Sequence, residues 1–420
     1  MSMHCAREHS GSMRLEPLPS QCLVDRELVV RVLGARPGER VEISLRNAGA
    51  NGSFFASSAT FIADRDGTVD LTAHAPVDGS YRNVHPMGLF WSRVQHAGPP
   101  PADVPEDPLT AILTVSAAGR QVVQTIRRVY REDVTSRIIQ EDGLVGRFIT
   151  PTNAGPRPAV LVVGGSGGGL GWSAQVAALL ACHGFSSLAL SYFGGEGQPS
   201  ELKHIPLEYF GGAIDWLGKQ AEVRNGQIGM LGCSRGGELA LLVGAHYPGV
   251  RAVVAYVPSV IVGSGYPDGQ SPAWTWRDRE VPFARDNSGT NAITTHSFYS
   301  QLLQRGSVGD LCIEVERIAG PVMLISGRVD GVWPSAELAD LAVKRMRSAG
   351  FPHQLEHLSY EDAGHDIAWP NAPTTMNRFQ HPLTGEELDA GGTAEGTAYA
   401  SRNSWPRMLE FLRSALGLCQ

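Results

Sequence analysis

Apolar and polar residues alternate through the first third of the chain. Runs such as ELVVRVLG, RVEISLRN, SATFIAD and TAILTVSA are rich in β-branched residues, and Gly, Pro, Asn and Asp separate them. Alternation with a period of two indicates strands with one buried face, and many short strands at this spacing are typical of a β-sandwich. The pattern therefore predicts an all-β sandwich domain over residues 13–131, after a disordered tail at 1–12.

After about residue 158, continuous apolar runs alternate with segments that have apolar residues at helical spacing. Runs such as PAVLVVGG, SSLALSYFG, QIGMLGC, VRAVVAYV, PVMLISG and QLEHLSYE indicate strands buried on both faces. Helices are expected in WSAQVAALLACHG, LEYFGGAIDWLGKQ, RGGELALLVGAHY and SAELADLAVKRMRSAG. The chain thus predicts an α/β domain over 158–420, with a linker and leading strands at 132–157. A stretch rich in Gly, Pro and Ser, about 262–309, interrupts this order and predicts a cap-like insertion.

The segment 232–236, GCSRG, joins a predicted strand to a predicted helix. In this context G-x-S-x-G is the sequence of a nucleophile elbow, in which a sharp turn presents a serine hydroxyl above the sheet. The flanking glycines are needed because side chains there would block the turn. Ser234 is therefore the candidate nucleophile, and the alternative is a helix-capping turn with Ser234 as the N-cap residue.

The two neighbours of Ser234 have less reactive interpretations. Only the central residue of an elbow points at substrate, so Cys233 is expected to turn inward as a small apolar residue instead of acting as a thiol nucleophile. Arg235 either attracts an anionic substrate or pairs with Glu238 one turn later, and the pairing is favoured.

An elbow serine requires an acid and a base later in the chain, in the order Ser, Asp, His. Asp330 follows the strand PVMLISG, and His365 follows the strand QLEHLSYE, so both are expected at the carboxyl edge of the sheet. The imidazole would remove the serine proton and the carboxylate would orient the imidazole. Asp310 and Asp340 are poorer candidates for the acid, and Asp362 and Asp366 are expected to be turn carboxylates.

A glycine-rich loop, residues 164–170 (GGSGGGL), follows the first strand of the α/β domain. Backbone amides in such a loop can approach a developing oxyanion closely. One donor is expected from the amide of Ser166 or Gly167, and the other from the amide of Arg235, which follows the nucleophile. The competing interpretation, a phosphate-binding loop, lacks the G-x-x-x-x-G-K-[ST] pattern.

Composition and charge narrow the classes of partner. With 420 residues, 42% hydrophobic and 18% charged, the chain suits a folded two-domain protein. A net charge of -7 argues against nucleic acid. No apolar run is long enough to span a bilayer. The amino terminus lacks the apolar region of a secretion signal, and the chain does not end in Ser-Lys-Leu. A cytoplasmic location without membrane attachment is therefore expected. The six cysteines are scattered, and neither a metal site nor a cofactor is expected.

Taken together, the motifs resemble those of the acyl-CoA thioesterases related to bile acid-CoA:amino acid N-acyltransferase. The resemblance extends over nearly the whole chain. It includes the opening LEP near Leu15, GSYRNVHPMGLFWS, GGSGGGL, LLACHGFSSLALSYFG, the elbow with GGELAL, GRVDGVWPS, DAGH and GGTAEGTAYASRNSWPRMLEFL. The insertion 262–309 and the stretch MNRFQHPLTGEELDA do not match the family pattern, and these are the places where substrate would be chosen.

The resemblance implies an α/β-hydrolase domain preceded by an immunoglobulin-like sandwich, with the triad on Ser234, Asp330 and His365. It also implies that hydrolytic members use serine at the elbow and the N-acyltransferases use cysteine. The expected activity is hydrolysis of an acyl thioester, carried by coenzyme A or a carrier protein, through an acyl-enzyme. The alternatives are acyl transfer to an amine or alcohol, carboxylester or peptide hydrolysis, and a binding module without activity.

Overall fold

The computed structural model describes residues 12–48, 53–96, 109–153, 155–285, 294–306 and 308–418. The chain divides into two compact units. Unit 1 consists of Met1–Tyr130 and Pro370–Met376, and unit 2 consists of Arg131–Trp369 and Asn377–Gln420. Apart from Ser12, the tail predicted at 1–12 lies outside the described residues.

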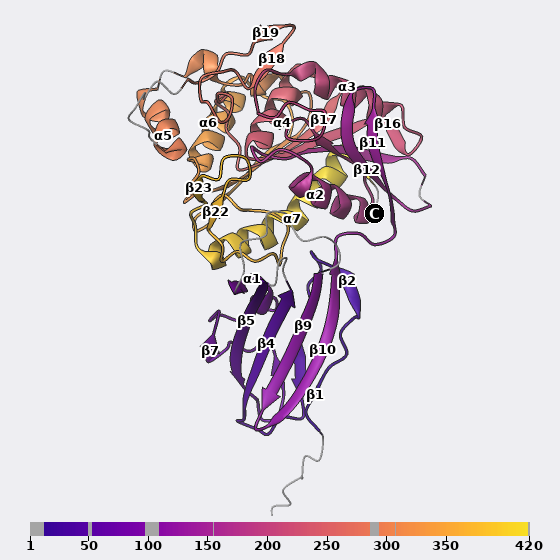
Figure 1. Ribbon diagram of the computed structural model, residues 1–420, viewed down its shortest axis with the longest axis vertical. Helices are drawn as coiled ribbons and strands as arrows, with labels where there is room; N and C mark the ends of the chain where they lie inside the picture. Colours follow the sequence, from indigo (N-terminus) through magenta and orange to yellow (C-terminus); the bar gives the residue numbers. More distant parts are fainter. Residues whose placement is uncertain are drawn as a thin grey trace, which may run out of the picture. The chain divides into compact units, whose positions relative to one another are not determined.

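Unit 1 is built mainly from antiparallel strands (Figure 1). A three-stranded sheet has the order β1-β3-β6, and a seven-stranded sheet has the order β2-β10-β9-β4-β5-β7 with β8 also paired to β5. One pair, β2 with β10, is parallel. The elements are β1 Arg14–Leu15, β2 Gln21–Leu23, β3 Arg31–Leu33, β4 Arg40–Ala48, β5 Phe54–Ile62, β6 Val69–Asp70, β7 Asp78–Gly79, α1 Gly88–Trp91, β8 Val94–His96, β9 Leu109–Ala117 and β10 Arg120–Val129.

Two long strands of unit 1, β5 and β9, bury every second side chain over most of their length. In β5 the buried positions alternate with partly exposed ones, and β9 repeats this pattern from Ala111 onward. This is the burial expected when one face of an antiparallel sheet packs against a core. The strands predicted from alternation in the sequence are therefore present.

Residues 370–376 return to unit 1 from the second half of the chain. The Asn371 side-chain amide donates to the Val24 carbonyl at 3.1 Å, and the Thr374 amide donates to the Trp91 carbonyl at 3.0 Å. The buried Arg93 guanidinium donates to the Asn371 carbonyl at 3.3 Å. The sequence pattern had placed this segment in the second domain.

Unit 2 contains an eight-stranded sheet of order β11-β12-β14-β13-β16-β17-β20-β21. The pairs β11–β12 and β12–β14 are antiparallel, and the other neighbours are parallel. The strands are β11 Val134–Glu141, β12 Leu144–Pro151, β13 Arg157–Val163, β14 Ser186–Ser191, β16 Val223–Cys233, β17 Val250–Tyr256, β20 Val322–Gly327 and β21 Leu355–Tyr360.

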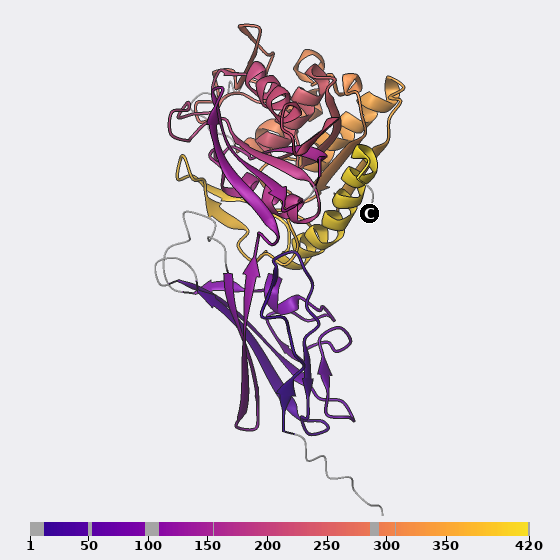
Figure 2. The same cartoon turned by 90° about the vertical axis from the view of Figure 1, so that its right-hand side faces the viewer.

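Helices cover both faces of this sheet, so the predicted α/β class is confirmed. Every residue of β14 and β20 is buried, as expected for strands between two helical layers. In Figures 1 and 2, α2 and α7 lie on one side of the sheet, and α3, α4 and α6 lie on the other. The helices are α2 Gly171–Cys182, α3 Leu207–Gly218, α4 Arg235–His246, α6 Ser335–Ser348 and α7 Ala394–Leu416.

The sequence did not predict α7. It spans 23 residues, has Pro406 in its interior and begins at the N-cap Thr393, whose hydroxyl accepts from the Gly396 amide. Glycine and proline inside the segment hide its helical periodicity. The helix packs on β16, β17, β20 and β21, and its side chains Trp405 and Phe411 are buried, so tertiary contacts stabilise it.

Short elements lie beside the main sheet; β18, β19 and α5 belong to the predicted insertion 262–309, and the others lie before it, at its end or after it. A three-stranded sheet has the order β15-β18-β19, and β22 pairs with β23 in a separate hairpin. Residues 286–293 and 307 lie outside the described part of the insertion. The elements are β15 Ile205–Pro206, β18 Trp274–Trp276, β19 Arg279–Glu280, α5 Thr295–Arg305, η2 Gly309–Leu311, η3 Val315–Arg317, β22 Arg378–Gln380 and β23 Glu387–Asp389.

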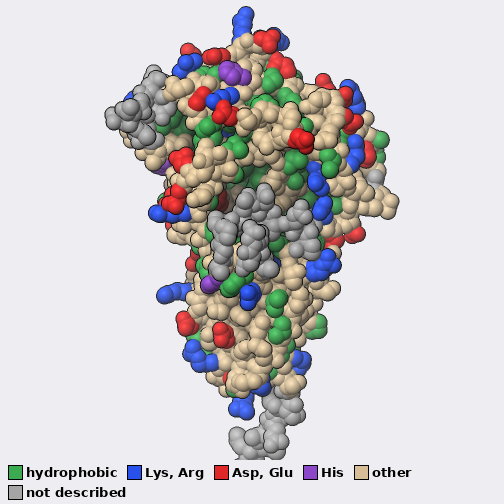
Figure 3. Space-filling view, viewed as in Figure 1, with side chains coloured by type: hydrophobic (Ala, Val, Ile, Leu, Met, Phe, Trp, Pro, Cys, Tyr) green, Lys and Arg blue, Asp and Glu red, His purple; other side chains and the backbone are tan. Residues whose placement is uncertain are grey.

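The surface of unit 2 has no large field of one charge on the face shown in Figure 3, where acidic and basic side chains are interspersed. Within the described residues, every helix is too short or too polar to cross a bilayer.

Candidate active site

Ser234 lies in a strained turn between β16 and α4. Its φ of 58° and ψ of -122° are rare for a residue with a side chain. A Cβ on Gly232 would lie 1.9 Å from the Gly236 carbonyl oxygen, and a Cβ on Gly236 would lie 2.3 Å from the Gly164 carbonyl oxygen. Both glycines are therefore required sterically, as the motif predicts. Ser234 stands at the N-cap position of α4, as the alternative interpretation expects, but its hydroxyl makes no capping hydrogen bond.

The structure brings the three predicted side chains together in one hydrogen-bonded row. The distance from Ser234 Oγ to His365 Nε2 is 2.9 Å, and the distance from His365 Nδ1 to Asp330 Oδ2 is 2.8 Å. Both His365 and Asp330 are buried. We call Ser234, His365 and Asp330 the elbow row.

Backbone contacts fix the acid and the imidazole. The second carboxylate oxygen of Asp330 accepts from the amides of Val332 and Trp333 at 2.9 and 3.2 Å. The His365 amide donates to the Ala390 carbonyl at 2.7 Å. Asp330 follows β20 and His365 follows β21, so the loops at the carboxyl edge of the sheet carry both.

The surroundings of His365 favour its protonated form. Burial by itself lowers the pKa of the imidazole, but the charge and hydrogen bond of Asp330 outweigh this effect and raise the pKa above its usual value. An imidazolium that forms when the ring accepts a proton from Ser234 is thus stabilised where it forms.

The glycine-rich loop after β13 lies against the nucleophile. A Cβ on Gly165 would be 3.1 Å from Ser234 Cβ and 3.6 Å from its Oγ. The hydrogen bonds of the described residues include none donated by the amides of Ser166, Gly167 or Arg235. These three amides, predicted as oxyanion donors, therefore have no partner within the described part of the chain.

The two neighbours of Ser234 have different environments. Burial raises the pKa of the Cys233 thiol far above its usual range, which disfavours a thiolate, although the residue keeps partial exposure instead of turning fully inward. The predicted pairing of Arg235 is confirmed, because its Nη1 donates to Glu238 Oε2 at 2.8 Å.

The Arg235–Glu238 pair also attaches the insertion to the first turn of α4. Arg235 Nη2 donates to the carbonyls of Gly263 and Ser264 at 3.1 and 2.9 Å. The carboxylate of Glu238 accepts from the Gly263 amide at 3.1 Å and from Trp274 Nε1 at 2.7 Å. The residue that follows the nucleophile is therefore held by the segment that lies over it.

A cavity of about 230 Å³ opens beside Ser234, and we call it the elbow cavity. It has hydroxyl, imidazole and carboxylate groups on its wall as well as aromatic rings. Its lining residues are Ser166, Ser234, Arg235, Ser264, Gly265, Tyr266, Pro267, Gly269, Thr295, Phe298, Tyr299, Val332, Trp333, His381, Glu386 and Leu388.

Several of these lining residues carried no signal in the sequence. His381 and Glu386 belong to the stretch MNRFQHPLTGEELDA, which matched no family pattern, and Tyr266 and Phe298 belong to the insertion. A tilted ring contact between Tyr266 and His381, with centroids 4.6 Å apart, joins these two unmatched segments. Their approach depends on tertiary packing and has no local sequence signature.

A second row of the same residue types runs from the sheet to α6. Ser326 Oγ is 2.8 Å from His357 Nε2, and His357 Nδ1 is 3.2 Å from Asp340 Oδ1. We call Ser326, His357 and Asp340 the sheet row. Asp340, a competitor for the acid role in the sequence, thus pairs with a different histidine.

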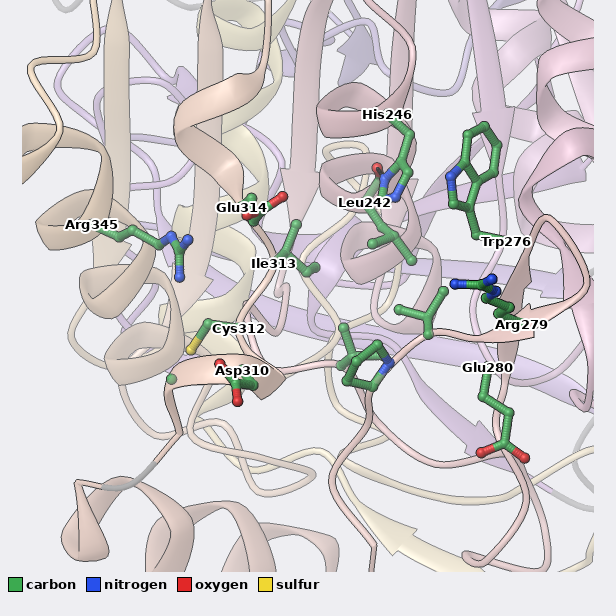
Figure 4. Close-up of a pocket in the computed structure, with 14 residues that line it drawn as sticks. Leu242, His246, Trp276, Arg279, Glu280, Asp310, Cys312, Ile313, Glu314 and Arg345 are labelled. Carbon is green, nitrogen blue, oxygen red and sulfur yellow. Dashed lines mark hydrogen bonds between the residues drawn. The ribbon is translucent and has the colours of Figure 1, made fainter.

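A larger cavity of about 520 Å³ lies along the carboxyl-terminal part of α4 (Figure 4). Its walls include Leu242 and His246, and none of its lining residues belongs to the elbow row. Arg345 at its edge is already paired with Glu316 at 2.5 Å. Among the described residues, no group of three or more His, Cys, Asp or Glu side chains is arranged to hold a metal ion.

Two relatives match nearly the whole chain. Acyl-coenzyme A thioesterase 1 of Mus musculus is 28% identical over 420 residues, covering 97% of each chain. Bile acid-CoA:amino acid N-acyltransferase of Mus musculus is 28% identical over 429 residues, covering 96% of this chain and 98% of its own. The solved α/β hydrolase GrgF from Penicillium sp. sh18 is 18% identical, with a TM-score of 0.43 over 68% of this chain and 99% of its own.

Two family models match in tandem. The model described as "Acyl-CoA thioester hydrolase/BAAT N-terminal region" matches residues 25–141, and the model described as "BAAT / Acyl-CoA thioester hydrolase C terminal" matches residues 205–418. The chain therefore belongs to the family of acyl-CoA thioester hydrolases and bile acid-CoA:amino acid N-acyltransferases, as its motifs predict.

Proposed function

We propose that this chain hydrolyses acyl thioesters of the acyl-CoA type, with Ser234 as nucleophile, His365 as general base and Asp330 as the orienting acid. The observation that carries the proposal is the continuous hydrogen-bonded elbow row, which begins at a strained serine on the wall of a cavity. A strained backbone conformation persists only where the surrounding structure holds it. Here the turn at Ser234 is possible because Gly232 and Gly236 have no side chains that would clash with the backbone.

The reaction proceeds in two steps. His365 accepts the proton of Ser234 as Oγ attacks the acyl carbonyl, and the amide of Arg235, together with that of Ser166 or Gly167, donates to the oxyanion. The carbon–sulfur bond breaks, and the thiolate leaves as the thiol with the proton from His365. Water then attacks the acyl-enzyme, His365 takes its proton and returns it to Ser234, and the carboxylate product leaves.

The architecture supports the same proposal. The order of the eight strands and the position of the elbow after β16 fit an α/β-hydrolase domain, and we propose that unit 1 is an immunoglobulin-like sandwich. A cytoplasmic location stays a prediction from the sequence.

Acyl transfer is the second candidate, because one full-length relative is named as an N-acyltransferase. It would use the same acyl-enzyme and replace water by an amine. Serine at position 234 favours hydrolysis, since the family resemblance implies cysteine in the transferases.

A panel of acyl-CoA substrates tests the proposal, with release of the free coenzyme A thiol as the readout. The intact chain should release thiol and acid in equal amounts, and Ser234→Ala should not. A new amide formed when amino acids are supplied, detected by mass spectrometry, would favour transfer. Substantial turnover by Ser234→Ala would disprove the role of the serine.

A further inference from the structure

A second serine and histidine meet on the wall of the elbow cavity. Ser166 Oγ is 3.0 Å from His381 Nε2. Ser166 lies in the glycine-rich loop after β13, whereas His381 lies just after β22 and is buried. Both residues line the cavity that also contains Ser234. The elbow row does not use either side chain.

The hydrogen bonds of His381 determine where its proton is. The Leu383 amide donates to His381 Nδ1 at 3.3 Å, so Nδ1 is the acceptor and the hydrogen of the neutral ring is on Nε2. Burial lowers the pKa of the ring, which keeps it neutral. Nε2–H therefore donates to Ser166 Oγ.

This arrangement excludes one role for the pair and leaves another. Both nitrogens of His381 are engaged, so the ring has no free lone pair with which to act as a second general base. The oxygen of Ser166 accepts from the ring, and among the described residues this is its one hydrogen bond. The hydroxyl proton of Ser166 is free to donate, and it is a stronger donor because the oxygen already accepts.

Ser166 lines the cavity in which a carbonyl attacked by Ser234 would lie. The preceding Gly165 is packed on Ser234, where an added Cβ would be 3.1 Å from Ser234 Cβ. A group bound to Ser234 Oγ inside the elbow cavity is therefore next to the loop that carries Ser166.

We propose that the Ser166 hydroxyl donates a hydrogen bond to the oxyanion, in addition to the main-chain amides, and that His381 is the residue that positions it. The inference rests on the proposed acyl-enzyme mechanism. As the Ser234 Oγ–carbon bond forms, the π electron pair of the carbonyl moves onto its oxygen, and the Ser166 O–H points at that charge. No proton is transferred to or from Ser166 or His381.

Removal of the hydroxyl alone is the first test. Ser166→Ala keeps the backbone amide and should lower kcat by roughly 10²-fold with KM little changed, because the donor acts mainly in the transition state. Ser166→Thr keeps a hydroxyl and should recover most of kcat. Ser326→Ala is the matched control, because it removes a serine hydroxyl that is also bonded to a histidine but lies outside the cavity. This variant should keep the kcat of the unmodified chain.

The rate of labelling by a fluorophosphonate separates failure of this inference from failure of the proposed function. The reagent places a phosphoryl oxygen where the oxyanion forms, so Ser166→Ala should label Ser234 more slowly than the unmodified chain. If the unmodified chain is not labelled, or if Ser234→Ala is labelled equally, the proposed function fails. If Ser234 is labelled normally, and Ser166→Ala keeps both its labelling rate and its kcat, the inference alone is overturned.

The positioning role of His381 is tested by variants of the ring. His381→Leu should lower kcat, His381→Gln should recover part of it because its side-chain amide can donate to Ser166, and the double variant with Ser166→Ala should lose little beyond Ser166→Ala. Additive losses would contradict the role of His381. If His381→Leu does not fold, as judged by circular dichroism, the comparison of Ser166→Ala with Ser166→Thr decides whether the hydroxyl acts.

Discussion

Unit 2 contains two rows in which a serine, a histidine and an aspartate are hydrogen bonded in sequence. The elbow row and the sheet row have nearly equal Ser–His distances, 2.9 and 2.8 Å. Their surroundings differ. Ser234 lies in a strained turn on a cavity wall, whereas Ser326 lies inside β20 with no exposed surface.

The two rows also differ in the burial of the aspartate and in the pKa of the histidine. In the elbow row the aspartate side chain is fully buried, whereas the aspartate side chain of the sheet row is 51% exposed. The pKa of His365 is raised, but the pKa of His357 is lowered, because burial there outweighs the attraction of a solvated Asp340. Neither cavity described above is lined by a member of the sheet row. Hydrogen-bond distances alone do not identify a catalytic row. The elbow row differs from the sheet row because its serine is on a cavity wall and its aspartate is buried.

The largest expected effect comes from the two serines. Ser234→Ala should reduce kcat for thioester hydrolysis by roughly 10⁴-fold or more, because it removes the nucleophile. Ser326→Ala should leave kcat within about twofold, since its hydroxyl has no access to substrate. Thiol release by the two purified variants, at matched folded concentrations, measures the contrast. Equal losses would mean that the distinction drawn from access is wrong.

The two aspartates should differ next. Asp330→Asn should lower kcat by about 10³–10⁴-fold, because an amide at this position favours the wrong tautomer of His365. Asp340→Asn serves as the control, and steady-state rates should stay near those of the unmodified chain. A large loss in Asp340→Asn would show that the sheet row supports catalysis.

The pH profile should report His365 and not His357. The base must be neutral, so kcat/KM should fall as the pH is lowered through the pKa of His365, and this midpoint should lie above the usual 6.5 because Asp330 raises it. Asp330→Asn should move the midpoint to lower pH, whereas His357→Gln should not move it. A midpoint below 6.5 in the unmodified chain would contradict the assigned charge balance.

The smallest effect concerns stability. Ser234→Gly should raise the free energy of unfolding by about 1 kcal/mol while abolishing activity, because glycine relieves the positive φ of the turn. Ser326→Ala should lower it by about 1 kcal/mol through loss of the bond to His357. Urea denaturation followed by circular dichroism measures both. Destabilisation by Ser234→Gly would show that the turn is not strained.

The sequence predicted the elements and residues whose signals are local. Apolar runs indicated the parallel strands, and the positions of Asp330 and His365 just after two of these strands indicated that they approach Ser234. The sheet row could not be predicted in this way. His357 meets Ser326 because of the register between β20 and β21, and Asp340 reaches it from α6, so three unrelated elements must already be in place.

The same limit applies to the wall of the elbow cavity. His381 is 215 residues from Ser166, its hydrogen-bond partner, and the segment that carries it has no periodicity that indicates where it folds. A motif identifies the reacting atoms, since their chemistry constrains the nearby sequence. The residues that surround the substrate are held by long-range packing, which many sequences can supply.

The return of residues 370–376 to unit 1 bears on how the protein can be dissected. The chain passes from one unit to the other after residue 130, again after 369 and again after 376. A truncation at the first of these points would leave Asn371 and Thr374 without the carbonyls of Val24 and Trp91 to which they donate. Separately expressed halves would therefore each lack part of a native unit, and a single protease cut between them would not release two complete domains.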